Sequence, residues 1–165
     1  MIYRLPLPAA GLVGFEVAGK ARWVYNVDTG EMGQQIKITN KTGGASVKGY
    51  ILEASDSTDR AVGLIDAAND PDPIGIVYEA GIADESDMWI WCEGAICEVY
   101  YIDTATHGQF ARTGVTGDTG ETAGQAVAEA VPTSPFATDK HFQEIGHVLT
   151  THSGAGLALT WFHTN

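Results

Sequence analysis

The chain has 165 residues and a formal net charge of −12 at pH 7, with only nine Lys and Arg. This length suits one compact domain with an additional arm, and the acidic surface repels phosphate backbones, so we expect no nucleic-acid binding. No apolar run approaches the length of a bilayer span, so we expect no membrane insertion either.

Residues 1–30 predict an extended N-terminal arm. Two prolines and several glycines interrupt short apolar pieces, so we expect no helix longer than about two turns there. The first residues also lack the apolar core of a signal peptide, which predicts synthesis in a cytoplasm.

The apolar side chains of this arm need a surface to cover them. A domain of this size has little room for a second apolar layer over its core, so we expect a neighbouring subunit to cover the arm. The residues expected at this interface with a partner or subunit are Ile2, Tyr3, Leu5, Leu7, Leu12, Val13 and Phe15.

The remainder, residues 31–165, is predicted to be a single β domain. β-branched and aromatic residues favour strands at residues 34–40 and 46–53, while residues 61–68 fit either a strand or one helical turn. The acidic residues 69–73 offer carboxylate oxygens for calcium. They lack the spacing and central glycine of a calcium loop, so we expect a solvated turn.

Residues 74–101 form the most strongly β-forming stretch. They comprise a strand, an acidic turn at residues 84–87 and a longer strand rich in aromatic residues. At period two, Trp89 and Trp91 share one face of the longer strand and hence, we expect, one environment. Gly94 interrupts the pattern and predicts a bulge or a bend.

The C-terminal stretch repeats this layout. Residues 144–148 resemble residues 73–77, with the pattern Ile-Gly-x-Val in both, and an alternating run that contains a Trp follows. We infer two related β units, at residues 46–101 and 105–165. The predicted fold is therefore all-β, a small β-barrel or β-sandwich built from two related β units and preceded by the extended N-terminal arm.

The glycine-rich residues 113–124 raise the question of phosphate binding. A phosphate loop needs a Lys before its Ser or Thr, whereas here Glu121 follows Gly120, so we expect a surface loop. The next stretch, residues 123–131, has the strongest local helix tendency in the chain, and the prolines that follow would end a helix there.

Histidines are the best enzymatic candidates, but their spacing matches no zinc signature. His147 and His163 would lie on adjacent strands if the last segment is a hairpin, which leaves a metal or proton-transfer role as the minor alternative. No Gly-x-Ser-x-Gly elbow is present. We therefore expect no enzyme, with no catalytic, cofactor-binding or metal-binding residues. The five histidines are His107, His141, His147, His152 and His163.

Cysteines and tryptophans leave further alternatives. Cys92 and Cys97 lie an odd number of residues apart in one predicted strand. We therefore expect a reduced, buried pair rather than a disulfide or a metal pair.

The four Trp residues suit either the core or a platform for stacking sugars, and we expect core packing for most of them.

The order of these parts resembles small virion proteins of tailed bacteriophages, of the capsid decoration (cement) or head-fibre type. The likeness covers roughly residues 35–165 and lies in short glycine-punctuated phrases. These phrases are Gly-Gly-Ala-Ser-Val-Lys-Gly-Tyr, Pro-Ile-Gly-Ile-Val-Tyr-Glu-Ala-Gly and His-Phe-Gln-Glu-Ile-Gly-His-Val-Leu. The resemblance implies a small β-barrel or β-sandwich that binds the outside of the capsid shell, often as a trimer, with shell contacts made by the N-terminal arm.

The leading hypothesis is therefore a structural virion protein that binds the outer capsid surface and stabilises the shell. Its expected partners are the major capsid protein and further copies of itself, as a homo-oligomer and, by the resemblance alone, a trimer. We expect it on the virion after synthesis in the host cytoplasm, and we expect no cofactor. The alternatives are a trimeric fibre or adhesin module that recognises host-surface glycans, and a hydrolase with a His or carboxylate site.

Overall fold

A computed structural model describes residues 3–4, 12–17, 19–65, 72–114, 123–130 and 144–164, with side chains from residue 19 onward. All regular secondary structure in these ranges is β, which confirms the all-β prediction. Within the same ranges, no helix has the length and apolar character that a membrane span requires. The predicted interface residues Ile2, Leu5 and Leu7, the residue His141 and most of the acidic turn at residues 69–73 lie outside the described residues.

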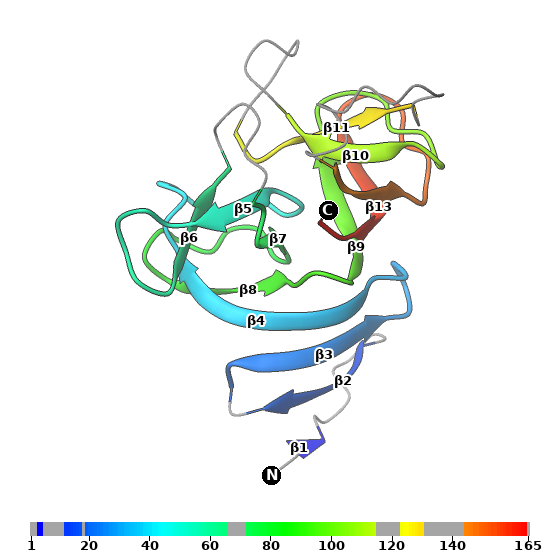
Figure 1. Ribbon diagram of the computed structural model, residues 1–165. Helices are drawn as coiled ribbons and strands as arrows, with labels where there is room; N and C mark the ends of the chain where they lie inside the picture. Colours follow the sequence, from blue (N-terminus) through cyan, green and yellow to red (C-terminus); the bar gives the residue numbers. More distant parts are fainter. Residues whose placement is uncertain are drawn as a thin grey trace.

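The N-terminal strands extend the sheet beyond the rest of the molecule (Figure 1). These are β1 (Tyr3–Arg4), β2 (Leu12–Val17) and β3 (Ala21–Asn26). β2 pairs antiparallel with β3 over six positions, and β3 pairs antiparallel with β4 (Met32–Asn40) over five. Part of the predicted arm is thus an antiparallel addition to β4.

A first group of five strands closes on itself. It contains β4, β5 (Ile51–Ala54), β6 (Ala61–Leu64), β7 (Gly75–Val77) and β8 (Asp87–Trp91). β5 lies between β6 and β7, β7 pairs with β8, and β8 returns antiparallel to β4, which also runs parallel to β6. We call this ring unit 1.

The second group repeats these pairings. It contains β9 (Ile96–Tyr101), β10 (Phe110–Thr113), β11 (Ala126–Glu129), β12 (Glu144–Val148) and β13 (Gly156–Phe162). β10 lies between β11 and β12, β12 pairs with β13, and β13 returns antiparallel to β9, which meets β11 in parallel. We call it unit 2. The repeated pairings span residues 32–91 and 96–162, whereas the sequence pattern placed the two units at 46–101 and 105–165.

The shared Ile-Gly-x-Val pattern has a steric cause. Gly75 lies on β7 and Gly146 at the equivalent place on β12. A Cβ at Gly75 would stand 2.7 Å from the carbonyl oxygen of Trp91, and a Cβ at Gly146 would overlap the carbonyl oxygen of Trp161. Both glycines therefore allow close approach of two strands, β7 to β8 beside Trp91 and β12 to β13 beside Trp161. A side chain at either glycine would collide with the backbone of the neighbouring strand.

The long strand predicted to end at Tyr101 is broken, and that prediction was wrong. β8 ends at Trp91 and β9 begins at Ile96. Between them Gly94 has φ +85°, and its N–H donates to the carbonyl of Phe162 at 2.9 Å. Of the two expected alternatives, a bulge or a bend, the chain therefore bends at Gly94, where it passes from unit 1 to unit 2.

The helix tendency of residues 123–131 is also overridden. Residues 126–129 form β11, which pairs with β10 at four consecutive positions. A helix this short is marginal in water, whereas strand pairing inside unit 2 satisfies the same backbone groups and half-buries the side chains.

A charged network ties the two units together. Glu31 is fully buried. Lys48 Nζ lies 3.1 Å from Glu31 Oε2 and 2.6 Å from Glu98 Oε2 on β9. Burial lowers the pKa of Lys48, but its contacts with the two carboxylates outweigh burial and raise that pKa above its ordinary value of 10.5. The buried carboxylate thus lies against a cation that also contacts unit 2.

Candidate functional site

The clearest exposed aromatic surface of the described residues lies on β3. Trp23 is 45% exposed and Tyr25 is 41% exposed, while Val24 between them is buried. Alternation along the strand therefore points both aromatic side chains outward. Met32, which pairs with Tyr25 across β3 and β4, is exposed as well. We call Trp23, Tyr25 and Met32 the aromatic face.

The opposite side of β3 is anchored to unit 1. The guanidinium of Arg22 lies 4.1 Å from the ring centre of Trp89 and 5.1 Å from that of Tyr78, both within cation–π range. Its Nε donates to Gln35 Oε1 on β4 at 2.7 Å. These contacts hold β3 in one orientation, so the aromatic face is presented by a fixed strand.

The predicted interface residues that the structure describes lie on the neighbouring strands. Phe15 is the Cα partner of Trp23, and Val13 is the Cα partner of Tyr25. The remaining partner pairs are Leu12 with Asn26 and Tyr3 with Glu16. Strand register therefore brings the positions Val13 and Phe15 directly beside the two exposed aromatic residues, which the sequence analysis had not included in the interface.

The Trp residues do not share one environment, and core packing for most of them was a wrong prediction. Trp91 is fully buried, whereas Trp23 is exposed and Trp161 is 48% exposed. Trp89 is half-buried beneath Arg22. Trp91 and Trp89 differ because residues of unit 2, among them Cys97 and Phe162, pack with Trp91 in one core cluster.

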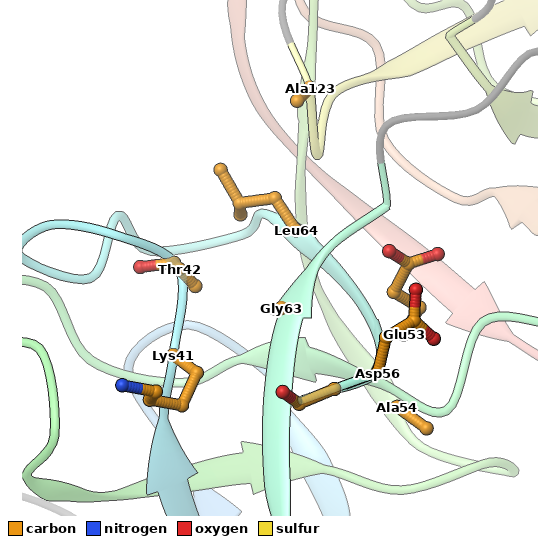
Figure 2. Close-up of a pocket in the computed structure, with 9 residues that line it drawn as sticks. Lys41, Thr42, Glu53, Ala54, Asp56, Gly63, Leu64 and Ala123 are labelled. Atoms are coloured by element: carbon orange, nitrogen blue, oxygen red, sulfur yellow. The ribbon is translucent and has the colours of Figure 1, made fainter. Parts of the chain in front are cut away.

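Two cavities are lined chiefly by residues of unit 1, and charged side chains contribute to both. Figure 2 shows Lys41 and Thr42 on one side of Gly63, and Glu53 and Asp56 on the other, around a cavity of about 300 Å³. Lys41 also pairs with Glu85 at 2.9 Å. Charges of both signs line this cavity, and its lining includes no His or Cys, so it offers no nucleophile with an adjacent imidazole base.

The second cavity, of about 360 Å³, adjoins the start of β3. Its charged lining consists of Lys20, Lys37, Arg60 and Asp87. Lys20 and Asp87 are 3.7 Å apart, and both are largely exposed, so this pair contributes little to stability. No catalytic arrangement is present among these four side chains.

The four histidines that the structure describes occupy three separate places. His107 is exposed, and its Nδ1 lies 2.9 Å from Thr151 Oγ1. His152 forms an isolated bridge with Ala105. His147 on β12 and His163 after β13 lie together, with ring centres 5.1 Å apart, as a hairpin of the last segment implies.

Glu144 completes the group around His147 and His163. Its Oε1 is 3.2 Å from His147 Nε2 and 3.7 Å from His163 Nε2. Sequence reasoning missed Glu144, because an offset of three residues puts Glu144 and His147 on opposite faces of a regular strand. Gly146 has φ +141° between them, and the pairing of β12 with β10 shifts register there, so the regular alternation does not apply.

The two cysteines are both free, as expected for a reduced pair. Cys97 is fully buried on β9, and Cys92 is half-buried in the turn after β8. Burial raises the pKa of both thiols, that of Cys97 well above its ordinary value of 9.0. Neither thiol therefore has the depressed pKa of a reactive nucleophile.

Comparison with known proteins identifies no relative: no protein-family model matches the chain, and no curated protein matches it significantly.

Proposed function

We propose that this chain is a structural virion protein that binds the outer surface of a phage capsid and stabilises the shell, as a decoration (cement) protein does. The observation that carries the proposal is the aromatic face, in which Trp23 and Tyr25 are both more than 40% exposed on β3, a strand of the N-terminal arm that pairs with β2. Exposed aromatic residues grouped on one rigid strand are typical of contact surfaces.

The mechanism requires binding alone. A protein that binds the assembled shell and not its dissociated subunits stabilises the shell by mass action, so no catalysis or cofactor is needed. The aromatic face supplies apolar area, and its anchoring by Arg22 lowers the ordering cost of binding. The net charge of −12 complements a basic shell surface and increases the association rate.

The proposed partners are the major capsid protein and further copies of the chain, in a trimer on the virion surface. Self-association has to overcome the repulsion between copies that each carry −12. Added salt screens this repulsion, so the oligomer should tighten between low and physiological ionic strength. Sedimentation of the free protein at both salt concentrations measures this directly.

Binding to empty capsids tests the proposal. The wild-type protein should co-sediment with shells assembled from the major capsid protein of the phage that encodes it. A Trp23→Ser/Tyr25→Ser double variant should bind at least about ten-fold more weakly, because central exposed aromatic residues dominate interface energies. Leu149→Ser, which alters an exposed apolar residue on unit 2, is the matched control and should bind as the wild type does.

Deletion of residues 1–20 extends the test to the arm. The truncated protein should keep a β-type circular dichroism spectrum, because β3 still pairs with β4, and should lose capsid binding. Full-strength binding by the truncated protein, or by the double variant, would contradict the proposal.

The second candidate function is a trimeric fibre or adhesin module that recognises host-surface glycans. The exposed Trp161 favours this alternative, because a sugar ring can stack on an exposed indole. A glycan array separates the two functions. Glycan binding that is abolished by Trp161→Ala, without capsid binding, would favour the adhesin.

A further inference from the structure

Unit 2 holds a cluster of three side chains that no other part of the described chain reproduces. Glu144, His147 and His163 each offer one ligand atom, and these atoms all lie within 4.8 Å of one another. β12 supplies Glu144 and His147, and His163 directly follows β13, the strand paired with β12. The His163 N–H donates to the carbonyl of Ile145 at 3.0 Å, which fixes its backbone next to Glu144.

The spacing of the ligand atoms suits a small transition-metal ion. A tetrahedral zinc site with bonds of roughly 2.0–2.2 Å has ligand atoms about 3.3 Å apart. The Glu144 oxygen lies 3.2 Å and 3.7 Å from the two imidazole nitrogens, so small side-chain rotations bring all three atoms into bonding range. Two imidazoles and one carboxylate form a donor set that zinc accepts and that calcium and magnesium do not favour.

We propose that Glu144, His147 and His163 bind a divalent transition-metal ion, with Zn²⁺ as the best match. The site is open on one side, because His147 is partly exposed and His163 less so, while Glu144 is buried at its base. Three protein ligands leave a fourth position for water or for a donor from a partner. The inference departs from the sequence-based expectation of no metal, and it does not depend on the proposed function.

The bound ion links the two last strands of unit 2. One ligand follows β13 and two lie on β12, so binding cross-links β12 to β13, the strand that carries the exposed Trp161. The Trp161 ring meets the His163 ring edge-on, with centres 5.4 Å apart. The metal therefore stabilises the folded chain and fixes the position of this indole.

Direct metal binding to the full chain tests the proposal. Protein treated with chelator and then dialysed should bind one Zn²⁺ per chain in calorimetry, and Zn²⁺ should raise its melting temperature. Co²⁺ should give the visible absorption of a tetrahedral site and should quench the fluorescence of Trp161, which a Trp161→Phe variant identifies. Neither readout depends on any activity.

Single-ligand variants locate the site. His147→Ala and His163→Ala should each weaken Zn²⁺ binding by about 100-fold or more, because loss of a ligand exceeds the roughly 10–100-fold cost of losing an outer-shell partner. His107→Ala is the matched control, since His107 is exposed and bonds to Thr151 away from the cluster. Circular dichroism confirms folding, and the exposure of His147 makes His147→Ala the safer variant.

Two results would overturn the proposal. One is the absence of saturable Zn²⁺ or Co²⁺ binding by the wild-type protein. The other is equal affinity of His147→Ala, His163→Ala and His107→Ala, which would show adventitious binding elsewhere on the surface.

Discussion

Units 1 and 2 have the same strand pairings, yet the tryptophans at equivalent positions differ in burial. Trp91 pairs with Ile76 across β7 and β8, and Trp161 pairs with His147 across β12 and β13. Trp91 is fully buried and Trp161 is 48% exposed. The same position in the strand pairing is therefore buried in unit 1 and exposed in unit 2. The difference arises because residues of unit 2, among them Cys97 and Phe162, pack with Trp91.

A second difference concerns the first strand of each unit, which is β4 in unit 1 and β9 in unit 2. β4 has nine residues and carries β3 along it, whereas β9 has six and pairs with β13 and, at single positions, with β11 and β4. The longer strand lets unit 1 carry the aromatic face. Unit 2 instead carries the Glu144, His147 and His163 cluster, so the two copies of one topology support different surfaces.

The largest expected effect is the difference in unfolding free energy between variants of Trp91 and of Trp161. Trp91→Ala should lower the free energy of unfolding by about 3–5 kcal/mol, because it removes a buried aromatic side chain that packs in the core with both units. Trp161→Ala should change it by about 0.5 kcal/mol or less. Urea denaturation of the two variants measures both values, and similar losses would mean that the units are more alike than their burial indicates.

A smaller effect tests the glycine of the Ile-Gly-x-Val pattern that the two units share. Gly75→Ala and Gly146→Ala should each cost about 1–3 kcal/mol or more, because the added Cβ meets the backbone of Trp91 or Trp161. Gly63→Ala on β6 is the matched control, since a Cβ there has no neighbour within 4 Å. A neutral effect at Gly75 or Gly146 in the same denaturation assay would remove the steric account of the repeated pattern.

The smallest effect arises from titrating groups on β9. Burial raises the pKa of Cys97 and of Tyr101, whereas the residue equivalent to Tyr101 in unit 1 is Asn40, which does not titrate. The folded state keeps protons that the unfolded state releases, so stability is complete below the ordinary thiol value of 9.0 and falls as pH rises above it.

The expected loss is about 1 kcal/mol per pH unit for each such group above its unfolded pKa. Melts between pH 8 and 10.5 under reducing conditions measure the loss. Cys97→Ala should flatten the decline just above pH 9, and an unchanged slope in that variant would assign the decline to other groups.

Sequence alone predicts the fold class and the existence of two units because both depend on local signals. Alternation of β-branched residues identifies strands, and the Ile-Gly-x-Val phrase records a close strand approach at Gly75 and Gly146. The bounds of the units were misplaced because β4 and β9 occupy equivalent places in the two sets of pairings but share no recognisable sequence pattern. Residues 126–129 were assigned helical tendency because local propensity does not include the pairing with β10.

The surfaces were harder to predict than the fold. Alternation shows that Trp23 and Tyr25 share one face of β3, but only the packing of Arg22 on Trp89 determines that this face points outward. Part of the cluster in unit 2 could be predicted from the sequence, since a hairpin of the last segment brings His147 and His163 together. Glu144 joins them through the irregular backbone at Gly146, which a strand pattern cannot encode.

The contiguous order of the two units has a consequence for synthesis on the ribosome. Every strand of unit 1 precedes Gly94, so its ring can close before any strand of unit 2 leaves the exit tunnel. Residues 92–165 take about 4–15 s to synthesise at roughly 5–20 residues per second. For most of that interval Phe162, which packs with Trp91 in the core cluster, has not been made, so part of the Trp91 surface faces solvent. Exposed apolar surface of this kind favours aggregation of the nascent chain until unit 2 has formed.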